Sequence, residues 1–255
     1  MTHNQYVRQS EAWYDTPAGK HVLSRERLLI AHMLSCWPRR NHTLLEMGCG
    51  GGHFLELFWN AGFDVTAIDE RQDCLDMARE RIGHRATLRQ GSLEHGPFDD
   101  DEFDFVTLVT VLEHMEYPEI VLREAFRVAR HGVLVLFYNS WSLYHLEQAV
   151  SPLAGKKRLS LPVDAACSPP GASESWLSPL KLAAMIRKEG GKRPDAFRST
   201  MFRPSRFWRG EDPPRWSLNR ASMTPFGAVA AFRVDLSPLS GTTIKLAARA
   251  AVPVR

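Results

Sequence analysis

One short stretch limits what this chain can fold into more than any other: an apolar run at 43–47 followed at once by a glycine-rich turn at 48–52. Glycine permits a positive φ and lets a ligand touch the backbone directly. After the turn, Phe54, Phe58 and Ala61 recur at helical spacing, and Gly62 then predicts the end of that helix. A strand, a tight turn and a helix N-terminus together favour an anion-accepting corner of an α/β protein.

Strands and helices are expected to alternate along the rest of the chain. Apolar runs predict strands at 64–69, 86–92, 103–110 and 133–138. Helical spacing predicts helices at 71–82, 119–130 and 179–189, and His131 and Gly132 are expected to close the second of these. The segments 192–204 and 226–236 are candidates for two further strands. Near-continuous apolar strands separated by helices indicate a parallel sheet covered on both faces.

The position of an acidic residue before the turn separates two kinds of nucleotide site. Dinucleotide enzymes use G-x-G-x-x-G, but counting from Gly48 or from Gly50 puts the third position at His53 or Leu55. The spacing here is E-x-G-x-G-x-G, with Glu46 two residues before the first glycine. A carboxylate there suits the ammonium and the cationic sulfur of S-adenosylmethionine better than it suits a pyrophosphate.

Three more strand ends carry candidate ligand-binding residues. Asp69 ends the second strand, 21 residues after Gly48, where a carboxylate can accept both hydroxyls of a ribose. Ser92 and Leu93 end the third expected strand and could flank an adenine. Residues 110–114 end the fourth expected strand. All of these belong to the carboxyl edge, where open α/β sheets bind their ligands.

With these residues in place, the sequence resembles the class I S-adenosylmethionine-dependent methyltransferases, in the branch often labelled type 11. LLEMGCGGG resembles the first motif of that family, VTAID its second, and residues 103–141 its fourth-strand to fifth-strand block. The resemblance implies a Rossmann-like, doubly wound, three-layer αβα fold. It also implies a seven-stranded, mostly parallel sheet that ends in an antiparallel hairpin.

The resemblance also assigns site residues and regions. It implies cofactor contacts at Glu46, Gly48, Cys49, Gly50, Asp69, Glu70, Ser92, Leu93 and Thr110, with Tyr14 covering the cofactor. We expect one domain over 1–255. Residues 1–40 would form an N-terminal helical cap, 41–145 the cofactor-binding core, and 146–255 an acceptor-side insertion, a helix and the terminal hairpin.

The expected reaction is in-line attack of an acceptor on an activated methyl group, for which alignment and exclusion of water matter most. A general base is needed only when the acceptor arrives protonated, and His114 is the candidate. Tyr138, Asn139, Tyr144 and His145 are candidates for the acceptor side. No motif predicts a metal site.

The sequence does not identify the methyl acceptor. A small molecule is the leading interpretation, with net charge +3 too small to require a polyanionic partner. Residues 192–220 hold eight Lys or Arg against three Asp or Glu, interleaved with aromatic residues, so an RNA or protein substrate is an alternative. A homodimer contact through the segment 202–220, an inactive S-adenosylmethionine-binding protein and an NAD(P) oxidoreductase are further alternatives.

The four cysteines show no C-x-x-C spacing, and the first residues contain no apolar leader. Val133–Tyr138, the longest strongly apolar stretch, is too short to span a bilayer. We therefore expect a cytoplasmic protein without a membrane partner.

Overall fold

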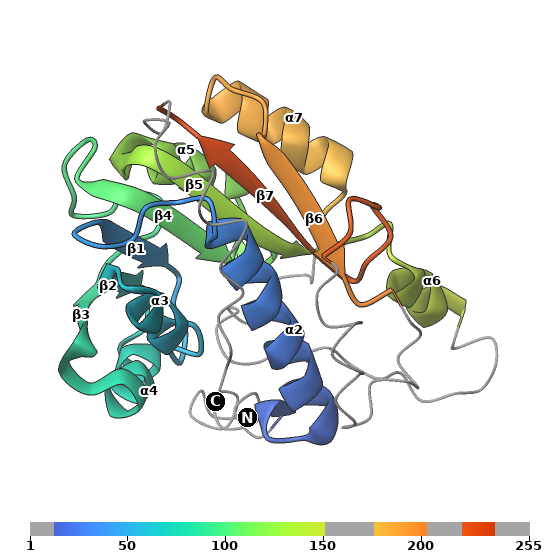
Figure 1. The fold of residues 1–255 in the computed structure, drawn as a ribbon, viewed down its shortest axis with the longest axis horizontal. Coiled ribbons are helices and arrows are strands. Elements are labelled where there is room, and N and C mark those ends of the chain that lie inside the picture. The colour runs from blue at the N-terminus through green and yellow to red at the C-terminus, as the bar shows by residue number, and fades with distance from the viewer. Residues whose placement is uncertain (1–12, 151–175, 203–220, 238–255) are drawn as a thin grey trace.

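The computed structural model describes residues 13–150, 176–202 and 221–237, which build one seven-stranded sheet between helices (Figure 1). The strands are β1 Thr43–Met47, β2 Asp64–Asp69, β3 Ala86–Gln90, β4 Phe103–Val109, β5 Ala129–Tyr138, β6 Ala196–Thr200 and β7 Val229–Asp235. Their order is β3-β2-β1-β4-β5-β7-β6. Strands β1 to β5 pair in parallel, and β7 is antiparallel to both β5 and β6. The predicted mostly parallel sheet with an antiparallel C-terminal pair is confirmed.

Helices cover both faces of this sheet. They are α2 Pro17–Leu34, α3 Leu55–Ala61, α4 Gln72–Ile82, α5 Pro118–Val128, α6 Leu143–Val150 and α7 Pro179–Glu189, with short 3₁₀ turns η1 Gly83–Arg85 and η2 Leu112–His114. In Figure 1, α5 and α7 lie on one side of the sheet and α2, α3 and α4 on the other. None of the helices in the described ranges is both long enough and apolar enough to cross a membrane.

The alternation of side chains along the strands divides the core into two layers. Leu44 belongs to the cluster that includes Phe58 of α3 and Leu75 of α4. Its neighbour Leu45 belongs to the cluster that includes Val121 of α5 and Leu182 of α7. Successive residues of a strand point to opposite faces, so a sheet buried on both sides needs apolar residues at consecutive positions. This explains the near-continuous apolar runs of the sequence.

The main differences from the sequence-based predictions are two element boundaries and one additional helix. Helix α5 ends at Val128, so His131 and Gly132 lie inside β5 and do not close the helix. Gly132 pairs with Phe105 of β4, and an added Cβ would lie 2.8 Å from a ring carbon of Trp37, so the glycine there makes room for an aromatic ring. Strand β3 ends at Gln90, two residues before Ser92. Helix α6 was not predicted.

The remaining comparisons concern the ends of the chain. The helix expected in the first forty residues is α2, and the predicted helix at 179–189 and the two candidate C-terminal strands are α7, β6 and β7. Most of the insertion at 151–176 and most of the basic aromatic segment, residues 203–220, lie outside the described residues. The expected division into three regions therefore stays a prediction.

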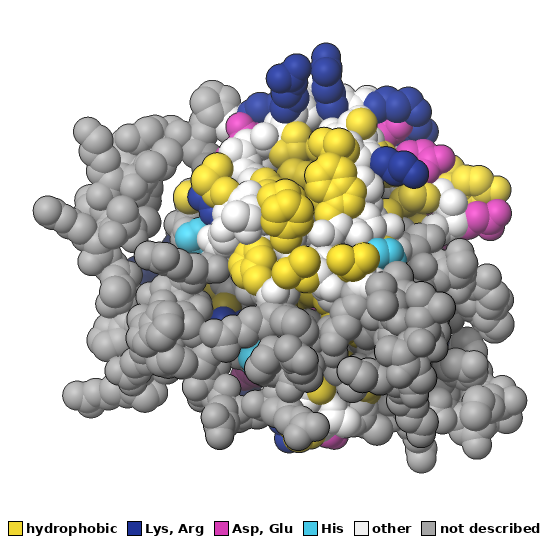
Figure 2. All heavy atoms as spheres, turned by 90° about the vertical axis from the view of Figure 1, so that its right-hand side faces the viewer, with side chains coloured by type: hydrophobic (Ala, Val, Ile, Leu, Met, Phe, Trp, Pro, Cys, Tyr) yellow, Lys and Arg dark blue, Asp and Glu magenta, His cyan; other side chains and the backbone are white. Residues whose placement is uncertain are grey.

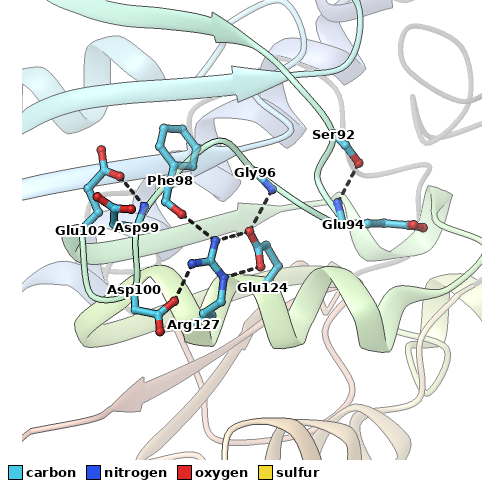
Figure 3. A network of polar contacts seen from close by, with 9 residues as sticks. All are labelled: Ser92, Glu94, Gly96, Phe98, Asp99, Asp100, Glu102, Glu124 and Arg127. Carbon is cyan, nitrogen blue, oxygen red and sulfur yellow. Dashed lines mark hydrogen bonds and ion pairs between the residues drawn. The ribbon is translucent and has the colours of Figure 1, made fainter.

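An ion-paired network fastens the loop between β3 and β4 to helix α5 (Figure 3). Glu124 accepts a hydrogen bond from the Gly96 amide at 2.8 Å and pairs with Arg127 at 2.6 Å. Arg127 also donates to the Phe98 carbonyl at 2.8 Å and to the Asp100 carboxylate at 2.6 Å. One guanidinium thus holds two points of the loop and also the Glu124 carboxylate that binds a third, which a lysine cannot do because its ammonium lacks the planar fork.

Replacing Arg127 with lysine should therefore lower the free energy of unfolding by about 1–3 kcal/mol, the range expected when hydrogen bonds to charged groups are lost. Chemical denaturation measures this change. Arg123→Lys on the same helix is the matched control, because Arg123 has one carboxylate partner, Glu189, and a side chain that is 59% exposed. That control should lose at most about 0.5 kcal/mol. Equal losses in the two variants would contradict the anchoring role.

Candidate functional site

The glycine turn at the end of β1 has a backbone that only glycine adopts readily. Gly48, Gly50 and Gly52 have φ values of +73°, +50° and +75°. At Gly48 a Cβ would also lie 2.7 Å from a methyl carbon of Val111. The bare backbone therefore brings the end of β1 against the loop after β4, and no side chain of the turn's glycines stands between the backbone and a ligand.

A cavity of about 490 Å³ opens at this carboxyl edge of the sheet. Its lining residues come from the ends of β1, β2 and β4 and from the loop after β3: Gly48, Asp69, Glu70, Arg71, Ser92, Leu93, Glu94, Thr110, Val111, His114, Met115, Glu116 and Tyr117. The volume lies in the range of small-ligand sites, roughly 300–1,000 Å³. The structure thus gathers predicted site residues from four separate sequence segments around one space.

Asp69 joins the glycine turn to the start of helix α4. One carboxylate oxygen accepts a hydrogen bond from the Gly50 amide at 2.8 Å, and the other accepts from the Arg71 amide at 3.0 Å. Each oxygen keeps a second acceptor position, as a carboxylate has about four. Burial raises the pKa of Asp69, and the two amide hydrogen bonds oppose that shift. Its free acceptor positions suit a donor such as a ribose hydroxyl.

Glu46 is a buried carboxyl group with an unsatisfied oxygen. The residue is 1% exposed, and its Oε2 atom has no hydrogen-bond partner within the described part of the chain. Burial, and then the nearby charge of Asp69, raise the pKa of Glu46 well above its usual value. A buried polar atom left without a partner is unfavourable by about 1–3 kcal/mol. A cationic group of a ligand at the turn would supply the missing partner, so these residues fit the ammonium of S-adenosylmethionine.

Another wall of the cavity is formed by Glu70, Ser92 and Leu93. The Leu93 amide donates to Glu70 Oε1 at 3.2 Å, which ties the loop after β3 to the end of β2. Ser92 is exposed and accepts a hydrogen bond from the Glu94 amide, whereas Leu93 is buried. The wall therefore offers an apolar side chain beside acceptor groups, as an adenine ring requires.

Thr110 and His114 close the site on the β4 side. Thr110 has a φ of +51°, an outlier for a β-branched residue and a form of strain that clusters at functional sites. Burial lowers the pKa of His114 to about 4, so its imidazole is neutral near pH 7. A group with so low a pKa is a poor proton acceptor at neutral pH, which weakens the case for His114 as the general base.

The other predicted residues surround the cavity without lining it. The Tyr14 ring lies 4.0 Å from the ring of His53, at the end of the glycine turn. The Cys49 thiol is buried in the core, and burial raises its pKa well above the usual value, so it is not a nucleophile near pH 7. Asn139 donates to the carbonyls of Pro225 and Gly227, so its amide serves the fold.

Among the acceptor-side candidates, Tyr138 and Tyr144 are almost fully buried. Burial lowers the pKa of His145. Sequence reasoning missed Arg71, Glu94 and residues 115–117, which line the cavity. It placed residues 110–114 at the binding edge without singling out Val111, which lines the cavity, or Glu113, which lies next to His114. The sequence signal that could have found Glu113 is an acidic residue directly after the apolar Val111 and Leu112. In the described ranges, no three His, Cys, Asp or Glu side chains converge as metal ligands.

A second hollow of about 390 Å³ lies between α7 and the edge strand β6, with Ala183, Arg187, Arg193, Phe197 and Phe232 among its lining residues. Figure 2 shows that hydrophobic side chains gather on this side of the molecule, with Lys and Arg along the upper rim. None of the predicted site residues lines this hollow. The candidate site is therefore the cavity at the carboxyl edge.

Comparison with known proteins agrees with this geometry. Residues 45–137 match the model of a methyltransferase domain family. The chain is 26% identical over 194 residues to a ubiquinone biosynthesis O-methyltransferase from Hydrogenovibrio crunogenus, covering 73% of this chain and 78% of the relative. It is 33% identical over 164 residues to a malonyl-[acyl-carrier protein] O-methyltransferase from Pectobacterium atrosepticum, covering 61% of this chain and 62% of the relative.

The fold is shared with a solved S-adenosylmethionine-dependent methyltransferase from Thermotoga maritima. The TM-score is 0.62 at 18% identity, over 91% of this chain and 97% of the other. The expected family, fold and cofactor are thereby confirmed. The matching domain, the sheet order and the relatives together support a class I S-adenosylmethionine-dependent methyltransferase.

Proposed function

We propose that this methyltransferase binds S-adenosylmethionine in the cavity at the carboxyl edge and methylates an oxygen atom of a small molecule. The observation that carries the proposal is the buried, unpartnered carboxyl oxygen of Glu46 beside a glycine turn. An acid at that place is unfavourable in the empty protein and becomes favourable when a ligand brings a cationic amino group.

In this proposal each wall of the cavity takes one part of the ligand. Asp69 accepts the ribose hydroxyls, and Leu93, with Ser92 and Glu70, borders the adenine. Glu46 faces the ammonium, and the backbone of the turn at Gly48, Cys49 and Gly50 borders the amino-acid end. On the remaining sides, Tyr14 covers the turn and Thr110 closes the β4 side.

S-adenosylmethionine supplies an activated methyl group, so the protein's part is to align the partners and keep water out. Val111 and Leu93 are buried apolar residues on the cavity wall and exclude water from it. The strained Thr110 fixes the point where β4 gives way to the η2 turn.

The relatives support a small acceptor methylated on oxygen. Both sequence relatives described above carry the name O-methyltransferase, one in ubiquinone biosynthesis and one acting on a malonyl-[acyl-carrier protein]. The chain spans 78% and 62% of their lengths, so the choice between such acceptors belongs to this proposal.

Titration calorimetry of the full chain with S-adenosylmethionine, S-adenosylhomocysteine and NAD tests the cofactor assignment. We expect the first two to bind and NAD not to bind. Radiolabelled methyl transfer to a phenol, to malonyl-CoA and to bulk RNA then tests the acceptor class. Binding of NAD alone, or transfer to RNA alone, would contradict the proposal.

Glu46→Gln should weaken S-adenosylmethionine binding by roughly 10-fold to 100-fold, because a hydrogen bond to a charged group is worth about 1.5–3 kcal/mol. The same variant should be more stable than the parent protein in the absence of ligand at alkaline pH. The folded-state pKa of Glu46 is raised, so its favourable contribution is present below its usual pKa of 4.5 and is lost as pH rises toward the folded value. Calorimetry and unfolding at pH 5 and pH 8.5 measure both effects, and an unchanged affinity would refute the role of Glu46.

Asp69→Asn should weaken binding of both S-adenosylmethionine and S-adenosylhomocysteine by a similar factor, roughly 10-fold to 100-fold, since both contain the ribose. Asp76→Asn is the matched control, an exposed aspartate on α4 whose loss should leave affinity unchanged. Equal affinities in the Asp69 variant and the control would remove Asp69 from the ribose site.

A further inference from the structure

Two buried carboxyl groups meet at the end of β5, outside the residues assigned above. Glu113 of η2 accepts a hydrogen bond from the Tyr138 amide at 2.6 Å. Glu26 of α2 accepts one from the Tyr138 hydroxyl at 2.9 Å. Both glutamates are 1% exposed. Helix α2, strand β5 and the turn after β4 therefore bring two acids to one tyrosine.

Each glutamate keeps one oxygen without a partner. Within the described residues, neither Glu26 Oε2 nor Glu113 Oε2 has a hydrogen-bond partner, although both atoms are buried. Buried unsatisfied polar atoms are few in native proteins, and each one calls for an explanation such as strain, catalysis or a bound group. A fold that needed only the Tyr138 contacts could use neutral side chains at both places.

Glu113 lies next to the cofactor cavity, although neither glutamate lines it. Val111 and His114, on either side of Glu113 in the chain, line that cavity. Tyr14, which covers the end of the glycine turn, interacts electrostatically with Tyr138. Glu113 is thus flanked in the chain by residues that border the cavity, and its hydrogen bond to the Tyr138 amide fixes it beside the end of β5.

We propose that Glu113 is the proton acceptor of the transfer centre and that the acceptor is a hydroxyl compound whose attacking oxygen still carries its proton. The inference rests on the proposed function and deepens it. The hydroxyl oxygen forms a bond to the methyl carbon as the carbon–sulfur bond breaks and its electron pair stays on sulfur. The hydroxyl proton passes to Glu113 Oε2, so charge and atoms balance.

The protonation of the cluster agrees with this role. Burial raises the pKa of Glu113 to about 7, near the value that suits a general base at neutral pH, whereas that of His114 is about 4. Burial raises the pKa of Glu26 to about 8, with the charge of Glu113 adding to the shift and Arg27 opposing it. Glu26 therefore holds its proton when Glu113 ionises, and the two titrate as a coupled pair.

Proton release on ligand binding tests the placement of Glu113 without any acceptor. S-adenosylmethionine carries a sulfonium and S-adenosylhomocysteine a neutral thioether, while both share the ammonium and the ribose. Proton changes that the ammonium and the ribose cause at Glu46 and Asp69 therefore cancel in the difference, and the Glu113→Gln variant separates the contribution of Glu113 from any other response to the sulfonium. A cation beside a carboxyl group lowers its pKa by roughly 1–3 units, so S-adenosylmethionine should release about half a proton more near pH 6.5.

The measurement is calorimetry of the full chain in two buffers of different ionisation enthalpy, between pH 5.5 and 8. Glu113→Gln should abolish the difference while keeping S-adenosylhomocysteine affinity within about threefold, since an amide oxygen can still accept from Tyr138. Glu80→Gln, an exposed site on α4, is the matched control and should keep the full difference. Thermal unfolding verifies that both variants fold.

Equal proton release by the two compounds in the parent protein would overturn the inference, as would an undiminished difference in Glu113→Gln. The comparison of proton release by the two compounds in the parent protein tests the inference even if the Glu113→Gln variant does not fold. Failure of both compounds to bind would contradict the proposed function itself, which separates the two failures.

A second measurement compares methyl transfer to a phenol and to malonyl-CoA, whose carboxylate needs no base. Glu113→Gln should slow transfer to the phenol by about 100-fold and remove the rise in rate between pH 6 and 7.5. Transfer to the phenol at an equal rate in both proteins, or transfer to malonyl-CoA alone, would overturn the inference.

Discussion

The binding edge depends on the two hydrogen bonds that the Asp69 carboxylate accepts from the amides of Gly50 and Arg71. One of these amides belongs to the turn after β1 and the other to the start of α4 after β2. A single side chain therefore sets the distance between two strand ends and keeps free acceptor positions toward the cavity. The positive φ of Gly48 and the position of Val111 follow from the same turn, because the backbone must bend sharply to reach Asp69.

Buried carboxyl groups are the common chemical feature of the site. Glu46, Glu26 and Glu113 are each 1% exposed and each retains an oxygen without a partner in the described chain. Burial raises the pKa of all three. Such groups lower the free energy of unfolding as pH rises, because their ionisation is unfavourable when they are buried. Their protonation can, however, respond to a cation that binds nearby. Binding of S-adenosylmethionine, which carries a sulfonium and an ammonium group, would offset the unfavourable burial of these carboxylates.

The sequence was enough to predict the sheet, because consecutive apolar residues such as Leu44 and Leu45 mark strands buried on both faces, and glycines mark the turns. Asp69 and Gly48 were predicted to lie together because strand ends of a parallel sheet share one edge. The end of α5 was not predictable, since whether Ala129–Gly132 is helix or strand depends on pairing with β4. The Glu113–Tyr138–Glu26 contacts were also out of reach, because they join residues 25 and 112 positions apart.

The contact between α2 and β5 has a consequence for how the chain matures on the ribosome. Helix α2 is synthesised before the sheet, and Tyr138 follows its partner Glu26 by 112 residues. Strands β6 and β7, against which α2 also packs, are synthesised later still. Synthesis proceeds at about 5–20 residues per second, so the surface of α2 that packs against these strands stays uncovered for several seconds. Newly made α2 is therefore a segment that a nascent-chain chaperone would meet before the sheet beneath it exists.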